Sequence, residues 1–206
     1  MEVTFEREKH VYHSDVFDEI VKDAIRFFNG TPVLRLPPAE KFAGTGIYAI
    51  YYTGKNEMYN ALFELNRVEF RFPIYVGKAV PSGWRQARDT LASSELYRRL
   101  KEHSKSIEDV GNLNTTDFYC RFAILEKNTA TLIGTLEAAL IRLYRPIWNT
   151  VLDGFGNHDP GSGRYNQAKS DWDVVHPGRV WAERCAGKPN DSATILDKIR
   201  NYTPNL

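Results

Sequence analysis

The seven residues GIYAIYY, numbers 46–52, decide the fold that we expect. They are mostly β-branched and aromatic, with a glycine at the start and another just beyond the end, which predicts a β-strand. Side chains alternate in direction along a strand, so Ile47 and Ala49 lie on one face and Tyr48 on the other. This segment therefore predicts a strand with an aliphatic face and a tyrosine-bearing face.

A second stretch, PIYVGKA at 73–79, repeats this pattern. Val76 lies on the aliphatic face and Tyr75 on the opposite one, and Pro73 suggests a bulge or an edge position in the sheet. If the aliphatic faces form the core, Tyr75 and Tyr48 point into the same cleft.

Two glycines flank these tyrosines, Gly46 in the first strand and Gly77 in the second. Because glycine has no Cβ, another backbone or a phosphate could approach closely at either position. In the alternative interpretation, Tyr48 and Tyr75 are simply two of 11 tyrosines, packing a half-buried sheet.

The rest of the chain predicts one more strand and several helices. Ser14 is a candidate N-cap for the first helix, and the segment 31–45 is proline-punctuated and predicts a connector. We therefore expect an α/β (α+β) fold, with a small, three-stranded, mostly antiparallel sheet flanked by helices. The other expected elements are a helix at 14–29, an insert with helical spacing at 55–69, a helix at 93–107, a strand at 117–126, a helix at 129–146 and a loop-rich C-terminal extension.

The composition narrows the class of protein. The chain has 206 residues, 42% of them apolar, which suits one globular domain with a real core. No apolar run approaches the roughly 20 residues of a membrane helix, and the charged N-terminus argues against a signal peptide. Cys120 and Cys185 have no metal-ligand spacing and fit a reducing compartment, so we expect a cytoplasmic protein without a membrane anchor.

Positive charge is concentrated in one part of the sequence. The whole chain has a net charge of only +1, but residues 71–105 hold 8 Lys or Arg against 3 Asp or Glu. Such a block suits phosphate groups, although most local charge runs are only solvated surfaces.

Within this block, Arg99 and His103 are four residues apart on the predicted helix and therefore share a face. Arginine offers a forked donor group that matches phosphate, and histidine titrates near neutral pH. An ordinary wet helix surface is the alternative interpretation of the same residues.

Five elements now occur in order: GIY at 46–48, YVG at 75–77, Arg99 with His103, Glu137, and Asn149. In this order, and on these expected strands and helices, they resemble the GIY-YIG nuclease family. The resemblance covers about residues 44–151 and implies hydrolysis of DNA phosphodiester bonds. It implies a single domain in which 1–43 form an N-terminal helical arm, 44–151 a catalytic core and 152–206 a DNA-recognition extension.

The resemblance implies a role for each motif residue. Arg99 would grip the scissile phosphate, and Tyr48 would orient or deprotonate the attacking water. Tyr75 would hydrogen-bond the phosphate or the water, and Asn149 would brace the site. His103 could take the proton onward or lower the pKa of Tyr48, and the sequence leaves these alternatives open.

Glu137 is the expected metal ligand. Mg²⁺ keeps several waters and often binds through only one or two carboxylates, so one acid can hold it, and we expect Mn²⁺ to substitute for it. Two-metal nucleases need several clustered carboxylates, which the motif positions do not provide. We therefore expect one divalent ion in each active site.

Additions to the core point to the restriction-enzyme branch of the family. From Tyr48 to Tyr75 the gap is 27 residues, about twice the usual family spacing, and the insert at 55–69 accounts for it. The stretch DGFGNHDPGSGR at 153–164 looks like the tail of the subgroup that cuts CCGCGG. The implied protein is bacterial, paired with a cognate DNA methyltransferase, and a homodimer on a palindromic site of double-stranded DNA. A monomeric homing or repair nuclease and a non-catalytic DNA-binding module are the alternatives.

Base and phosphate contacts are expected from side chains in the additions. Arginine, lysine and amide side chains suit guanine and adenine edges, but the sequence does not separate base contacts from phosphate contacts. The candidates are Lys78, Arg85, Gln86, Arg88, Arg164, Asn166, Gln167, Lys169 and Arg179.

Overall fold

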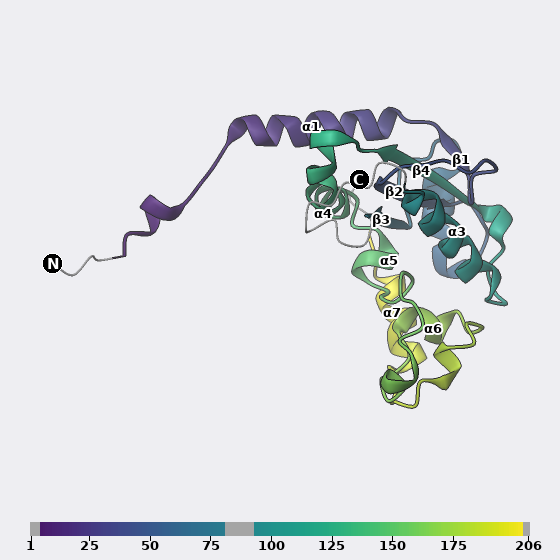
Figure 1. The fold of residues 1–206 in the computed structure, drawn as a ribbon. Coiled ribbons are helices and arrows are strands. Elements are labelled where there is room, and N and C mark those ends of the chain that lie inside the picture. The colour runs from purple at the N-terminus through teal and green to yellow at the C-terminus, as the bar shows by residue number, and fades with distance from the viewer. Residues whose placement is uncertain (1–4, 81–92, 204–206) are drawn as a thin grey trace.

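A computed structural model describes residues 5–80 and 93–203, with only the backbone of Ser162. Its centre is a four-stranded antiparallel sheet in the order β1-β4-β2-β3, with helices on both faces (Figure 1). The strands are β1 Val33–Arg35, β2 Gly46–Tyr52, β3 Tyr75–Ala79 and β4 Phe118–Ile124.

Strand β2 is buried on both faces over its whole length. One face carries Ile47 and Ala49 into a hydrophobic cluster with the helices α1 and α4. The other face carries Tyr48 and Ile50 into a second cluster, which includes residues from α3, α5 and the C-terminal extension. The predicted aliphatic core is therefore confirmed, but the tyrosine face is equally buried.

The helices of the core follow the predicted segments closely. Helix α1 begins after Ser14, whose Oγ accepts a hydrogen bond from the backbone N–H of Phe17, so the predicted N-cap is confirmed. Short 3-10 turns connect several elements. The α-helices of the described chain are α1 Asp15–Gly30, α2 Asn60–Asn66, α3 Glu95–Glu108, α4 Ile133–Tyr144, α5 Ile147–Thr150, α6 Asp171–Val175 and α7 Ser192–Arg200.

The sheet has one strand more than the three that we predicted. Strand β1 lies in the segment 31–45, which we interpreted as a connector, and it pairs antiparallel with β4. It is only three residues long and exposed on most of its length, so it has no alternating apolar pattern to reveal it. Its partner β4, rather than its own sequence, makes it a strand.

The extension is also more regular than its loop-rich sequence indicated. Helix α6 is capped by Ser170, whose Oγ accepts from the backbone N–H of Asp173, and α7 is capped by Asp191. Both helices bury apolar residues against each other and against the core, including Trp172 and Ile195. A serine or aspartate before a short apolar run was the available signal.

The N-terminal arm and the C-terminal extension are arranged differently around the sheet. The N-terminal arm and the start of α1 project away from the body, whereas α6 and α7 lie below α5 (Figure 1). Over the ranges 5–80 and 93–203, no helix has the length and apolar character that crossing a membrane requires.

Candidate active site

A buried tyrosine–histidine pair forms the base of the site. Tyr48, on β2, has its phenolic oxygen 2.6 Å from Nε2 of His103, on α3. Neither residue exposes more than 2% of its surface. His103 can reach Tyr48 because its face of α3 covers the tyrosine side of the sheet. Arg99 lies on the same face of the helix, as predicted.

The second motif tyrosine lies beside the first. Tyr48 is paired in register with Gly77, two residues along β3 from Tyr75, and the two rings are 6.3 Å apart between centroids. A Cβ at Gly77 would lie 2.4 Å from the phenolic oxygen of Tyr48. Gly77 therefore makes room for a tyrosine rather than for a phosphate. Gly46 instead accommodates the carbonyl of Ala123, which would lie 2.0 Å from an added Cβ.

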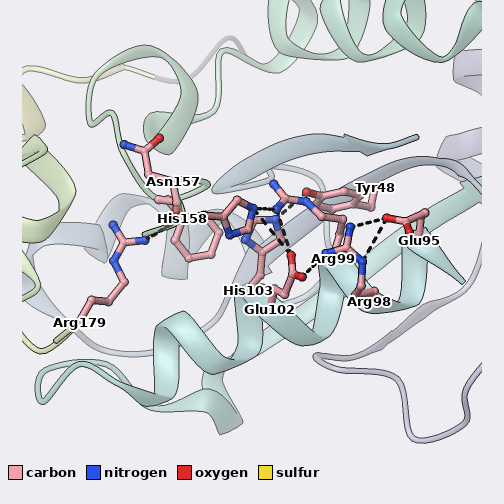
Figure 2. A network of polar contacts seen from close by, with 10 residues as sticks. Tyr48, Glu95, Arg98, Arg99, Glu102, His103, Asn157, His158 and Arg179 are labelled. Carbon is pink, nitrogen blue, oxygen red and sulfur yellow. Dashed lines mark hydrogen bonds and ion pairs between the residues drawn. The ribbon is translucent and has the colours of Figure 1, made fainter. Parts of the chain in front are cut away.

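Arg99 is held on one side of the site by two acceptors. Its Nη1 donates to Oε2 of Glu102 at 3.0 Å, one helical turn away, and it is also in hydrogen-bond contact with Nε2 of His158 (Figure 2). The Arg99 side chain is 18% exposed, so it is not fully closed off from solvent.

Glu137 reaches the same site from the opposite face of the sheet. Helix α4 packs Leu136 and Leu140 into the aliphatic cluster and leaves the Glu137 side chain 20% exposed. Its Oε2 accepts a hydrogen bond from Nζ of Lys78 at 2.5 Å. Lys78 lies on β3, the edge strand, so side chains from both faces of the sheet meet around this edge.

Asn149 braces the YVG strand through its side-chain amide. The amide Oδ1 accepts from the N–H of Val76 at 2.8 Å, and its Nδ2 donates to the carbonyl of the same residue at 2.9 Å. Helix α4 ends at Arg145, which has a left-handed φ of 46°, and α5 then turns the chain back toward β3. A single side chain thereby replaces the strand partner that β3 lacks on its outer edge.

These side chains line one cleft of about 370 Å³. The lining contains four predicted motif residues, together with acidic and basic groups from α3 and one histidine from the extension. It is formed by Tyr48, Tyr75, Lys78, Ala79, Val80, Glu95, Arg98, Arg99, Glu137 and His158. His103 lies behind Tyr48, and Asn149 lies behind β3, so the remaining two motif residues support the cleft.

Burial sets the protonation of the central pair. It raises the pKa of Tyr48 well above its ordinary value, an effect that Tyr75 adds to and Arg99 opposes. Burial, and then the positive charge of Arg99, hold the pKa of His103 well below its ordinary value. His103 is therefore neutral at pH 7, and we assign its proton to Nδ1, so that Nε2 accepts from the Tyr48 hydroxyl.

The C-terminal extension closes the back of the site. The ring of Phe155 stacks on His103 with centroids 4.7 Å apart and meets Tyr75 edge to face at 5.0 Å. A Cβ at Gly156 would lie 2.6 Å from the phenolic oxygen of Tyr75. The boundary between core and extension at residue 151 stays a prediction, but the extension supplies part of the wall.

Four charged or titratable side chains of the site had not been predicted: Glu95, Arg98, Glu102 and His158. Glu102 could have been found from its three-residue spacing to Arg99 on a helix, and Glu95 lies one turn before Arg98. His158 had no such local signal, because it comes from a loop that only the tertiary fold brings to α3.

The residues predicted to contact DNA have mixed positions. Lys78 lies in the cleft, Arg164, Asn166 and Gln167 are exposed in the extension, and Lys169 is paired with Glu183 at 2.6 Å. Arg85, Gln86 and Arg88 lie outside the described residues.

The prediction that Arg179 contacts DNA must be corrected, because this side chain is buried and only 2% exposed. It donates to Asp173 and to three backbone carbonyls, so a base edge would find no donor to accept from. Its role is inside the extension.

The antiparallel sheet, the paired motif tyrosines, the Arg–His helix and the single glutamate agree with the resemblance to the GIY-YIG nucleases. The family profile described as the Eco29kI GIY-YIG domain matches residues 40–203. The chain therefore belongs to this family of GIY-YIG restriction endonucleases, whose namesake, a type II enzyme, cuts CCGCGG. A search of curated proteins finds no match.

Proposed function

We propose that this chain is a site-specific type II restriction endonuclease, which hydrolyses phosphodiester bonds in both strands of a palindromic DNA site. The observation that carries the proposal is the 2.6 Å contact between Tyr48 and His103 on the wall of a cleft that also contains Arg99 and Glu137. A base, a phosphate ligand and a carboxylate are the groups that phosphodiester hydrolysis needs.

Tyr48 and His103 are suited to remove a proton from the attacking water. As the water oxygen bonds to phosphorus and the bond to the leaving oxygen breaks, the water proton passes to Tyr48. The Tyr48 hydroxyl proton passes at the same time to Nε2 of His103, which is neutral because burial and Arg99 lower its pKa. No free phenolate is needed, which is favourable because burial raises the pKa of Tyr48.

Arg99 is suited to hold the scissile phosphate, because its guanidinium offers paired donors to two oxygens. Tyr48 has no exposed surface. DNA must therefore draw the covering side chains aside before a water reaches the phenol. A phosphate at Arg99 would also offset the positive charge that opposes protonation of His103.

One divalent cation would bind at Glu137. The Lys78 ammonium already pairs with this carboxylate, which indicates that the position accepts a cation, and a single carboxylate matches the ligand needs of Mg²⁺. When bound, Mg²⁺ or Mn²⁺ would neutralise charge that develops on the phosphate and on the leaving oxygen. Asn149 would keep the YVG strand in place through its two hydrogen bonds to Val76.

Incubation of the full chain with long DNA and Mg²⁺ tests this function. Discrete fragments are expected, and sequencing of their ends would identify the recognition site, for which CCGCGG is the first candidate. Glu137→Ala should abolish cleavage and keep folding and DNA binding. Glu126→Ala, a change of an exposed glutamate outside the cleft, is the matched control and should cut normally. Smeared products, or rapid cutting by Glu137→Ala, would contradict the proposal.

One active site cuts one strand, so a double-strand cut at a palindrome requires two copies of the chain. The N-terminal arm offers a surface for this contact. Its apolar side chains are exposed, including Tyr12 (87%), Val16 (71%) and Ile20 (46%), where the arm projects from the body (Figure 1).

Sedimentation of the chain with and without its DNA site would test the dimer. Ile20→Glu should weaken assembly, and double-strand cutting should then give way to nicking. An unaltered chain that remains a monomer on its site at working concentration would contradict this part of the proposal. The exposed Arg164, Asn166 and Gln167 of the extension are the described candidates for base contacts.

A further inference from the structure

The loop 154–158 of the C-terminal extension packs directly on the catalytic residues. Phe155 stacks on the imidazole of His103, and Gly156 leaves no room for a side chain beside the hydroxyl of Tyr75. Phe155 and Gly156 are therefore as much a part of the site as the strands and helices that carry the motif.

At the end of this loop, His158 reaches over to the phosphate ligand. Its Nε2 is in hydrogen-bond contact with Nη1 of Arg99 and lies 3.8 Å from Oε2 of Glu102 (Figure 2). The His158 side chain is 60% exposed and lines the same cleft as the motif residues. Its contribution to core packing is therefore small.

Arg179 fixes the loop that carries this histidine. All five N–H donors of its guanidinium are used: two go to the carboxylate of Asp173, and the others go to the carbonyls of Gly154, Phe155 and Asn157. Asp173 and Arg179 are each about 2% exposed, so this clamp lies inside the extension. Such a saturated buried contact holds the backbone on either side of Phe155 in one conformation.

We propose that His158 is a positioning residue of the active site, which holds the Arg99 guanidinium in the orientation that receives the DNA phosphate. This inference rests on the proposed nuclease function. The two N–H groups of Nη1 are directed to His158 and Glu102, so the phosphate is received on the Nε and Nη2 side.

The chemistry of the contact agrees with this role. Burial, and then Arg99, lower the pKa of His158, so its Nε2 keeps the lone pair that accepts from the guanidinium. An arginine that is already oriented needs no rearrangement when the phosphate arrives, which lowers the barrier of the chemical step more than it tightens binding.

The test uses the full chain with Mg²⁺ and a DNA fragment that the unaltered protein cuts. We expect His158→Ala to lower the single-turnover rate about 10- to 100-fold, as expected for a misplaced reacting group. DNA affinity, measured without metal, should change much less. His158→Gln should recover most of the rate, because its amide oxygen can also accept from Arg99. Asn157→Ala, in the same loop, is the control and should cut normally.

Three outcomes would overturn the inference while the proposed function stands. His158→Ala could cut at the rate of the unaltered protein, or His158→Gln could be as slow as the alanine variant. Both variants could also unfold at a clearly lower urea concentration than the unaltered protein, which would make the role structural. If the unaltered protein cuts no DNA under any of these conditions, the proposed function and this inference both fall.

Discussion

Two buried tyrosine–histidine pairs in this molecule have the same contact and different surroundings. In the candidate active site, Tyr48 lies 2.6 Å from Nε2 of His103, and between the insert and the C-terminal extension Tyr59 lies 2.6 Å from Nε2 of His176. Both histidines are almost fully buried, and both have a pKa below its ordinary value because of burial.

The second pair is tied to further side chains by neutral hydrogen bonds. The hydroxyl of Tyr59 also accepts from Nε1 of Trp148 at 2.9 Å, and Nδ1 of His176 donates to Oδ1 of Asn112 at 2.8 Å. Tyr59 joins the insert to helix α5 and to the extension, so this pair connects three parts of the chain.

The first pair instead borders a cleft that contains Arg99, Lys78 and Glu137. A tyrosine–histidine contact is therefore no sign of catalysis by itself. The neighbouring charged side chains separate a candidate proton relay from a structural hydrogen bond.

Removing the tyrosine hydroxyl of each pair should distinguish the two pairs most clearly. Tyr48→Phe should lower the single-turnover rate about 10²- to 10⁴-fold, the usual value of acid–base catalysis, while folding persists. Tyr59→Phe should cut almost normally and lose about 1 to 3 kcal/mol of unfolding free energy, because a buried donor loses its acceptor. Cleavage kinetics and urea unfolding of both variants measure this. Equal effects on the cleavage rate would show that the two pairs do not differ in function.

The clamp behind the first pair should have the next largest effect. Asp173→Asn removes the charge partner of the buried Arg179 and should cost about 3 to 5 kcal/mol of unfolding free energy. Cleavage should fall with it, because the loop that holds Phe155 and His158 is released. Asp197→Asn breaks an exposed ion pair with Arg200 and should change little. Stability that is unchanged in Asp173→Asn would argue against the clamp.

Asn112 tests how firmly the second pair is held. Asn112→Ala leaves Nδ1 of His176 without its side-chain acceptor and should cost about 1 to 3 kcal/mol. The active-site cleft does not contain Asn112, so the cleavage rate at low temperature should stay near that of the unaltered protein. A loss of rate with normal stability would mean that the two regions are coupled.

Acidification should destabilise the folded protein through the histidines of both pairs. The pKa of His176 is about 3, whereas an unfolded histidine titrates near 6.5, and His103 is lowered in the same direction. The unfolded chain therefore takes up protons first, and stability is lost as the pH falls below about 6.5. Between pH 6.5 and 5 each histidine should cost about 1 to 2 kcal/mol.

Urea unfolding at several pH values measures this loss. His176→Gln removes one of the two titrating groups, so its stability should fall less steeply with acid than that of the unaltered protein. An unchanged pH dependence in this variant would contradict the low pKa.

Much of the catalytic core could be predicted because its signals are local. The alternation of side chains in 46–52, together with the glycines near the strands, predicted β2 and β3. The four-residue spacing of Arg99 and His103 predicted that these two residues share one face of α3. Each of these follows from the geometry of a single strand or helix. Strand β1 was not predicted because three residues are too few to show an alternating apolar pattern, and its pairing depends on β4.

The extension resisted prediction for a different reason. Arginine is a residue type that often contacts DNA, but Arg179 lies between the rings of Trp172 and Trp181. The centre of its guanidinium is 4.5 and 4.7 Å from their centroids. Nothing in the neighbouring sequence distinguishes an arginine that is buried and saturated from one that is solvated.

The sequence by itself determined the order of the motif and the elements that carry it, since strand and helix periodicity act over a few residues. Only the tertiary structure decided that Glu137 meets Lys78 around the open edge of β3, that Tyr48 and not Tyr59 shares a cleft with these two residues, and that His158 touches Arg99. These contacts join residues far apart in the chain, and they depend on packing, burial and charge that no local pattern contains.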